Sequence, residues 1–384
     1  MNRGWQNLWF VTALAVAAAI SSSASAQQPW KFTALMPLTG PNAGFAEEFR
    51  LGLTMAVEHM NQEGGIKGRP VSVDIMDTQS NPGQVASLSR KACEDSLLVF
   101  PSVSVESQVA FPVANSMKCP AVAYATGAEG LTAKNRPWGF SMLTPANITT
   151  PMAMNAVLKK IKVNSAAVLV ERNDPAAMSY GNAAIATMTK NGVKEETISV
   201  ASTDVDFGPA MTRATSGDPD MVFISTLERA AIGLIKEYRR SQVKSILMLS
   251  TSSFGGNVGN MGEDMLDGML RFSPSDPMVS DDPKVKEFVA AYIGRSSGRP
   301  PSLNSTLPYD LLFLTKYVIE KADLKGDASS RQEDRQKYID ELAKVKDWKG
   351  LGGRMSMTPD GYMEMFPAVM QYKRGSKWEA LKFD

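Results

Sequence analysis

Apolar runs of strand length alternate along this chain with segments whose apolar residues recur every three or four positions. In residues 31–36 (KFTALM), alternate side chains are apolar as in an extended strand, and in residues 46–65 (AEEFRLGLTMAVEHMNQEGG) the apolar side chains fall at helical spacing. Residues 37–45 (PLTGPNAGF) lie between them and are rich in Gly and Pro. They therefore predict a loop that joins a strand to a helix.

The same alternation continues through most of the chain. Short apolar runs with intervening helices are typical of parallel sheets covered on both faces, and their number exceeds what one small sheet holds. We therefore predict an α/β fold of two doubly wound parallel-sheet lobes. The further predicted strands are residues 70–78, 97–102, 121–126, 166–171, 197–202, 221–226 and 245–250.

Residues 1–26 predict a secretory signal peptide. Arg3 supplies a positive charge, the apolar segment after it is too short to span a bilayer, and Ala24 and Ala26 are small residues of the kind that signal peptidase accepts. We expect cleavage after Ala26 and a soluble mature chain in the periplasm that begins at Gln27. The residue directly after the predicted cleavage site is not a cysteine, so we expect no lipid anchor there.

Composition describes an ordinary globular protein. The 384 residues favour two domains, and 43% of them are hydrophobic and 21% are charged. The net charge is +1, and acidic and basic residues are interspersed. Neither nucleic acid nor an anionic membrane surface is therefore an expected partner.

Few residues suit metal binding or catalysis. Cys93 and Cys119 could form a disulfide or stay as buried thiols, and sequence separation alone does not decide between these alternatives. Two cysteines and a single histidine are too few for a typical zinc site, so we expect no metal. That histidine, His59, lies on a predicted helix far in sequence from the strand-following loops. We therefore expect neither a catalytic base nor a cofactor, and no enzyme.

In open parallel sheets, ligands bind beyond the carboxyl ends of the strands. The loops that follow predicted strands contain mainly hydroxyl groups, glycines and a few aromatic residues, which suits a site that orients a small polar group beside an aromatic wall. These loops are residues 37–45, 101–107, 125–130, 171–181 and 250–256.

Several motifs resemble one family. Residues 37–71, with NQEGGIKG at their end, are followed by DTQSNPGQ at 77–84, and later come SYG at 179–181, PDMVFIS at 219–225 and PYDLLFLTKYVIEKA at 308–322. Together they resemble the branched-chain amino acid type of periplasmic binding protein, the type I solute-binding proteins of ABC importers. The resemblance spans nearly the whole mature chain.

The resemblance implies a clamp whose two lobes are joined by a three-segment hinge. Lobe one would take residues 27–144 and 275–358, and lobe two would take residues 145–274 and 359–384. The lobes would close over a small-molecule ligand and present it to the permease subunits of an ABC transporter in the inner membrane. The resemblance also implies a monomer without a cofactor.

The family's ligand contacts fall on the loops identified above. The resemblance implies an aromatic residue over the ligand, hydroxyls that hold its polar end, and contacts from lobe two. Each also has an ordinary structural alternative, such as a helix cap for the serines. The implied ligand-binding residues are Phe45, Ser102, Ser104, Ala125, Thr126, Gly127, Tyr180, Ser252 and Phe254.

One departure from the family concerns charge. Amino acid binders of this type usually place an acid after the strand equivalent to residues 245–250, whereas this chain has STSSFGG. A buried ammonium group without a carboxylate is costly, so we expect a carboxylate or neutral ligand with aromatic walls rather than an α-amino acid. Glu106, Glu129 and Glu171 could replace the missing acid, but charged loop residues are mostly exposed.

Three functions fit these features. The first is solute binding for an ABC importer, the second is ligand sensing for a membrane receptor, and the third is hydrolysis on the same two-lobed fold. The absence of a fused signalling segment favours the first. Branched-chain or other amino acid binding remains the alternative for the ligand.

Overall fold

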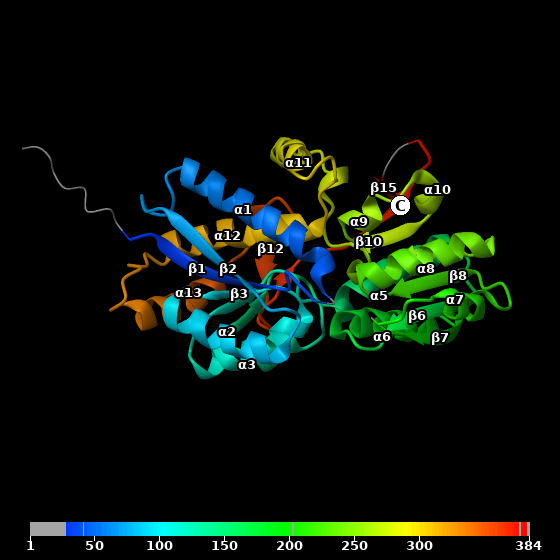
Figure 1. Cartoon of the computed structure of the whole chain (residues 1–384), viewed down its shortest axis with the longest axis horizontal. Coiled ribbons are helices and arrows are strands. Elements are labelled where there is room, and N and C mark those ends of the chain that lie inside the picture. Colours follow the sequence, from blue (N-terminus) through cyan, green and yellow to red (C-terminus); the bar gives the residue numbers. More distant parts are fainter. Residues whose placement is uncertain (1–27, 41, 202, 376–377, 382–384) are drawn as a thin grey trace, which may run out of the picture.

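The computed structural model describes residues 28–40, 42–201, 203–375 and 378–381, and two α/β lobes lie side by side in it (Figure 1). We define each lobe by its main sheet. The signal peptide predicted for residues 1–26 lies outside the described residues. No helix within the described ranges is long and apolar enough to cross a membrane.

Lobe one contains a parallel sheet in the order β2-β1-β3-β4-β5. Buried apolar side chains pack the pair α1 and α12 on one face and the pair α2 and α3 on the other, which produces the predicted layers. The strands are β1 (Trp30–Met36), β2 (Val71–Asp77), β3 (Val99–Pro101), β4 (Ala121–Ala123) and β5 (Gly139–Ser141), and the helices are α1 (Ala46–Gln62), α2 (Pro82–Asp95), α3 (Ser104–Ser116), α4 (Leu131–Lys134), α12 (Leu303–Lys321) and α13 (Arg331–Leu342).

Lobe two contains a sheet in the order β15-β14-β10-β9-β8-β6-β7, in which β14 and β15 are antiparallel to their neighbours. Helices α5 and α6 cover one face, and α7 and α8 cover the other. The strands are β6 (Ser165–Glu171), β7 (Lys194–Val200), β8 (Met221–Ser225), β9 (Ile246–Leu249), β10 (Leu270–Ser273), β14 (Ala368–Tyr372) and β15 (Trp378–Ala380), and the helices are α5 (Ala146–Lys160), α6 (Pro175–Lys190), α7 (Gly208–Thr215) and α8 (Glu228–Ser241).

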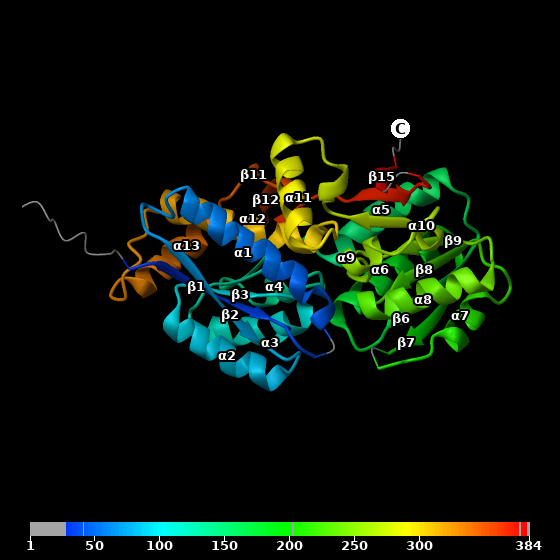
Figure 2. The same cartoon turned by 45° about the horizontal axis from the view of Figure 1, so that its top comes forward.

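Short elements complete the fold, and α11 lies beside α1 near the junction of the lobes (Figure 2). Phe288 and Tyr292 of α11 pack on Met55 of α1. The remaining elements are η1 (Ala43–Phe45), η2 (Thr251–Ser253), α9 (Gly256–Gly259), α10 (Glu263–Leu266), η3 (Pro277–Val279), α11 (Pro283–Arg295), β11 (Trp348–Gly350), β12 (Gly353–Met357) and β13 (Met363–Glu364).

The chain passes between the two main sheets after β5, after β10 and after β13. The hydroxyl of Thr144, at the first crossing, donates to the carbonyl of Met363 at 2.8 Å and accepts from the amide of Met365 at 2.8 Å, at the third. The predicted change of lobe after residue 358 precedes β13, but β13 pairs with β12 and Met363 lies in the lobe-one core. We therefore propose that the third crossing begins after β13.

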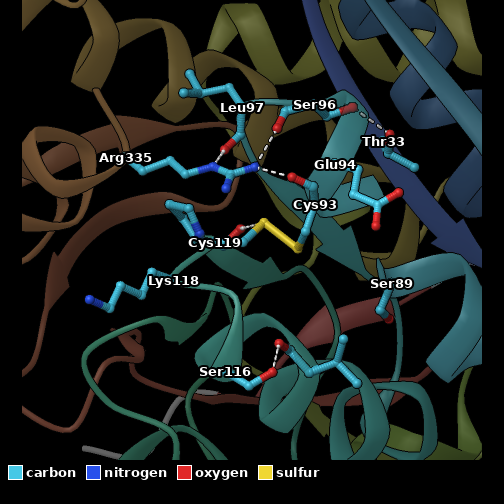
Figure 3. The surroundings of a disulfide bond; sticks show 12 residues. Thr33, Ser89, Cys93, Glu94, Ser96, Leu97, Ser116, Lys118, Cys119 and Arg335 are labelled. Atoms are coloured by element: carbon cyan, nitrogen blue, oxygen red, sulfur yellow. Dashed lines mark hydrogen bonds between the residues drawn. A yellow bond between two sulfur atoms is a disulfide. The ribbon is translucent and has the colours of Figure 1, made fainter. Parts of the chain in front are cut away.

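Cys93 and Cys119 form a disulfide, with their Cα atoms 5.8 Å apart (Figure 3). The bond joins the end of α2 to the segment before β4. Beside it, Arg335 of α13 donates from Nε to the carbonyl of Leu97 at 2.9 Å and from Nη2 to the carbonyl of Ser96 at 2.8 Å. Of the two alternatives left open by the sequence, the structure therefore has the disulfide.

Candidate functional site

A cavity of about 50 Å³ lies between the lobes, at the carboxyl ends of the strands. Lobe one contributes side chains from the loops after β1, β3 and β4, and lobe two contributes them from the loops after β6, β8 and β9. This is the place that strand order predicts for a ligand. The walls include Phe45, Phe49, Ala125, Gly127, Asp174, Tyr180, Leu227, Thr251, Ser252 and Asn304.

The loop after β1 positions Phe45 in this wall. The carboxylate of Asp77 accepts hydrogen bonds from the Thr39 amide at 3.1 Å and the Thr39 hydroxyl at 2.7 Å, and Gly40 takes a φ of +90°. The Thr39 hydroxyl therefore holds the loop. Phe45 is buried, and its ring centre lies 6.1 Å from that of Phe49.

The N-terminus of α3 lies behind the same wall. Ser104 is the first residue of this helix, and its hydroxyl oxygen accepts a hydrogen bond from the Ala128 amide at 3.1 Å. That bond joins the loop after β3 to the loop after β4. Because the first amides of a helix lack partners within the helix, this end favours an acceptor or an anion.

The Ser102 side chain bonds to another protein side chain and does not line the cavity. Its hydroxyl donates to Glu106 at 2.7 Å, and the same carboxylate accepts from the Thr78 hydroxyl at 3.0 Å and the Val103 amide at 3.2 Å. Glu106 is buried, and this burial raises the pKa of its carboxyl group. The expectation of a solvated Glu106 is therefore wrong.

Gly127 and Tyr180 approach each other across the cavity. A Cβ atom at Gly127 would lie 2.7 Å from the Tyr180 hydroxyl oxygen, so a side chain at this position would meet the ring. Thr149 and Thr251 lie near that hydroxyl, but it makes no hydrogen bond of good geometry within the described part of the chain. Tyr180 is buried, which raises the pKa of its phenol, so at neutral pH it is an uncharged group without a partner.

Asp174 is a cavity residue that the sequence did not single out. It caps α6, where its Oδ1 atom accepts the Ala177 amide at 2.8 Å, and burial raises the pKa of its carboxyl group. The local sequence Asn-Asp-Pro identifies only a helix cap. Nearby, Glu171 is buried and accepts the Leu227 amide at 2.8 Å, so the expectation of an exposed Glu171 is also wrong. Glu129 is exposed as expected.

The nine implied ligand residues separate into three groups. Phe45, Ala125, Gly127, Tyr180 and Ser252 line the interlobe cavity, whereas Ser102, Ser104 and Thr126 are buried without lining it. Phe254 lies elsewhere. Its ring centre is 5.3 Å from that of Trp378, and both rings line a different cavity.

The described residues that line the cavity include neither a metal-binding cluster nor a histidine. The described residues hold no group of three or more His, Cys, Asp or Glu side chains that could bind a metal ion. His59 does not line this cavity, and its Nδ1 atom lies 3.0 Å from the Tyr309 hydroxyl. The site therefore offers hydroxyls, helix amides, one carboxylate and aromatic surface.

Comparison with known proteins gives consistent matches over most of the chain. A family model described as "Periplasmic binding protein" matches residues 29–377. A leucine-, isoleucine-, valine-, threonine- and alanine-binding protein of Pseudomonas aeruginosa is 24% identical over 331 residues, which cover 84% of this chain and 86% of that protein. A Leu/Ile/Val-binding protein of Rhizobium johnstonii is 26% identical over 307 residues, covering 77% of this chain and 80% of that protein.

Solved structures share the fold. A leucine-binding protein of Thermotoga maritima superposes with a TM-score of 0.81 at 20% identity, covering 92% of this chain and 97% of that chain. A solute-binding protein of an ABC transporter from R. palustris, in complex with benzoate, has a TM-score of 0.81 at 19% identity, with coverages of 92% and 96%. These similarities confirm the predicted α/β fold of two parallel-sheet lobes.

Proposed function

This chain belongs to the periplasmic binding protein family, and from that premise we propose that it captures a small molecule between its lobes and delivers it to the permease of an ABC importer. The family match and the relatives confirm the resemblance to the branched-chain amino acid type. The relatives are binding proteins, which confirms that the chain is not an enzyme. We further propose that the mature protein begins at Gln27 and acts in the periplasm.

The observation that carries this proposal is the shared cavity. Tyr180 of lobe two lines it with a buried hydroxyl that has no partner among the described residues, opposite Gly127 of lobe one. A buried polar group without a partner costs free energy, which a ligand can recover by bonding to it. A ligand held by both lobes stabilises their closed arrangement, which is what a permease would recognise.

We propose a carboxylate or neutral ligand, with an aromatic ring as the favoured apolar part. No lysine, arginine or glutamate is among the residues that line the cavity, and Ser252 stands in the segment where amino acid binders place an acid. The N-terminus of α3 suits an acceptor oxygen, and Phe45 suits an apolar group beside it. The benzoate complex of the R. palustris relative supports this class.

Asp174 supports a second candidate, an α-amino acid. Its carboxylate lines the cavity from lobe two and could pair with an ammonium group, while the N-terminus of α3 holds the ligand carboxylate. The names of several relatives include amino acids. Whether the ligand needs the carboxylate of Asp174 therefore distinguishes the two ligand classes.

A thermal-shift screen of refolded mature protein tests both candidates. Amino acids, aromatic acids, aliphatic carboxylates and amides are compared, because a ligand that binds only folded protein raises the melting temperature. We expect aromatic carboxylates or amides to stabilise the protein, and Asp174→Asn to leave their affinity unchanged or improved. The exposed Glu129→Gln is the matched control.

Three other outcomes of these binding measurements would contradict this expectation. Stabilisation by an amino acid, lost in Asp174→Asn and kept in Glu129→Gln, would establish the second candidate. Binding to a receptor ectodomain, without binding to any permease, would instead identify a sensing module. Absence of stabilisation by every class would contradict the interlobe site itself.

A further inference from the structure

A second cavity, of about 230 Å³, lies in lobe two beside the segment that leads into α12. It shares no lining residue with the interlobe cavity. Aromatic and other apolar side chains form much of its wall. These include Phe254, Tyr372, Trp378, Met278 and Pro300.

Arg271 of β10 also lines this cavity, although it is only 3% exposed. Its guanidinium carbon lies 3.7 Å from the ring centre of Phe254 and 4.4 Å from that of Trp378, so aromatic faces stabilise the buried charge. Burial lowers the pKa of the guanidinium to about 9, which leaves it charged at neutral pH.

One structural role explains part of this arrangement. Arg271 forms an ion pair with Asp276, and Asp276 caps η3 by accepting the Met278 amide at 2.8 Å. The pair thus fastens the second crossing to the sheet. It does not use the Nε atom of Arg271, which is buried and has no hydrogen-bond partner within the described ranges.

A buried N–H of a cation without an acceptor is unfavourable, and here it belongs to a residue that lines a cavity. An acceptor oxygen in the cavity would satisfy it, while the rings of Phe254, Tyr372 and Trp378 would cover an apolar body. The volume lies below the range of drug-sized sites, which begins at about 300 Å³. A compact molecule is therefore the fitting occupant.

We propose that this cavity is a second ligand site, which takes a compact aromatic compound with one acceptor group, either a carboxamide or a carboxylate, bonded to Nε of Arg271. Both groups present the same acceptor oxygen, but they differ in charge. Because Asp276 already neutralises Arg271 and Glu263 also lines the cavity, we expect the neutral carboxamide to bind better.

Fluorine NMR on the full mature chain tests the proposal with three probes. These are 4-fluorobenzamide, 4-fluorobenzoate and, as the oxygen-free match, 4-fluorotoluene. Gly127→Val removes the interlobe cavity from the measurement, because a Cβ atom there meets the Tyr180 hydroxyl. In that background we expect the benzamide to bind at least about tenfold more tightly than the toluene.

Two glycine substitutions then locate the probe. A Cβ atom at Gly259 would lie 3.2 Å from Phe254 and 3.8 Å from Pro300, so Gly259→Leu fills the second cavity. A Cβ atom at Gly294 of α11 meets nothing within 4 Å, which makes Gly294→Leu the matched control. We expect benzamide affinity to fall about tenfold in Gly259→Leu and to stay unchanged in Gly294→Leu.

Three outcomes would overturn the proposal. Benzamide binding that is lost in Gly127→Val and kept in Gly259→Leu belongs to the interlobe cavity. Equal binding of 4-fluorotoluene removes the acceptor role of Arg271. Failure of both oxygen-bearing probes to bind up to their solubility limits excludes the site. Tighter binding of the benzoate than of the benzamide, with the same location, keeps the site but assigns it to anions.

Discussion

The carboxylate of Glu48 in lobe one accepts a hydrogen bond from the backbone amide of Gly256 in lobe two, with 2.6 Å between Oε1 and N. Glu48 lies on α1 and Gly256 begins α9, so this bond joins the lobes directly. The Ser302 hydroxyl donates to the other oxygen of Glu48. A single buried carboxylate thus connects three separate segments at the junction.

Glu48 makes the stability of this arrangement depend on pH. Burial, and then the charge of Glu228, raise the pKa of Glu48 to about 7, whereas Arg299 and the two hydrogen bonds act in the opposite direction. The folded protein therefore binds more protons than the unfolded chain between the ordinary pKa of about 4.5 and about 7. The contribution of Glu48 to the free energy of unfolding is therefore largest below this pH range and is lost as the pH rises through it.

We expect Glu48→Gln to flatten this pH dependence. Its free energy of unfolding should match that of the wild type near pH 4.5 and exceed it at pH 8 by up to about 3 kcal/mol, because the glutamine carries no buried charge. Urea unfolding across this range gives the measurement, with Glu129→Gln as the exposed control. Parallel pH profiles for wild type and Glu48→Gln would contradict the assignment.

Tyr180→Phe tests the unpartnered hydroxyl. Without ligand, we expect the free energy of unfolding to stay unchanged or to rise by up to about 1 kcal/mol, because the hydroxyl has no partner to lose. Affinity for the cleft ligand should fall about tenfold. Tyr338→Phe is the matched control, since the buried Tyr338 hydroxyl lies 3.0 Å from that of Thr315 and its loss should destabilise by about 1 kcal/mol. Equal destabilisation of both variants would show that Tyr180 has a structural partner.

Much of this site could be predicted because the loops after parallel strands meet at one edge of a sheet. The family resemblance assigned Phe45, Gly127 and Tyr180 to these loops, and all three residues line the interlobe cavity. Phe254 was not placed correctly by the same argument. Its direction depends on the short turn η2 and on packing against Arg271 and Trp378, which lie on strands that are distant in sequence.

Buried carboxylates were harder to predict than aromatic residues. Glu106 is buried because Thr78 and Ser102 donate hydrogen bonds to it, and Glu171 because it accepts the amide of Leu227. Thr78 and Leu227 come from other loops, so no local pattern shows them, and Ser102, four residues before Glu106, is an ordinary loop serine in the sequence. Asp174 has a local signature, but that signature indicates a helix cap and not its position in the cavity.

Removing the disulfide should destabilise lobe one. Cys93 and Cys119 are separated by 26 residues. Without the bond that closes a loop of this length, the unfolded chain gains entropy, and the free energy of unfolding falls by about 3 kcal/mol. We expect a Cys93→Ser, Cys119→Ser double variant to unfold at lower urea concentration. Reductant should lower the wild-type midpoint and leave that of the double variant unchanged. A wild-type midpoint that does not respond after complete reduction would contradict this role.

Ser104→Ala tests whether the N-terminus of α3 contributes to ligand binding or only to the stability of the fold. The substitution removes the oxygen that accepts the Ala128 amide at 3.1 Å, so the loop after β4 loses one link to the helix. One neutral hydrogen bond contributes about 1 kcal/mol, so the protein should remain folded with a slightly lower midpoint. Ligand affinity measured by calorimetry should fall by about tenfold, because the loop after β4, which lies beside the ligand, loses the hydrogen bond that positions it. Ser116→Ala is the matched control, since the Ser116 hydroxyl donates to the carbonyl of Val113 at the far end of α3. Unchanged affinity in Ser104→Ala, with the same midpoint as Ser116→Ala, would leave Ser104 as an ordinary helix residue outside the site.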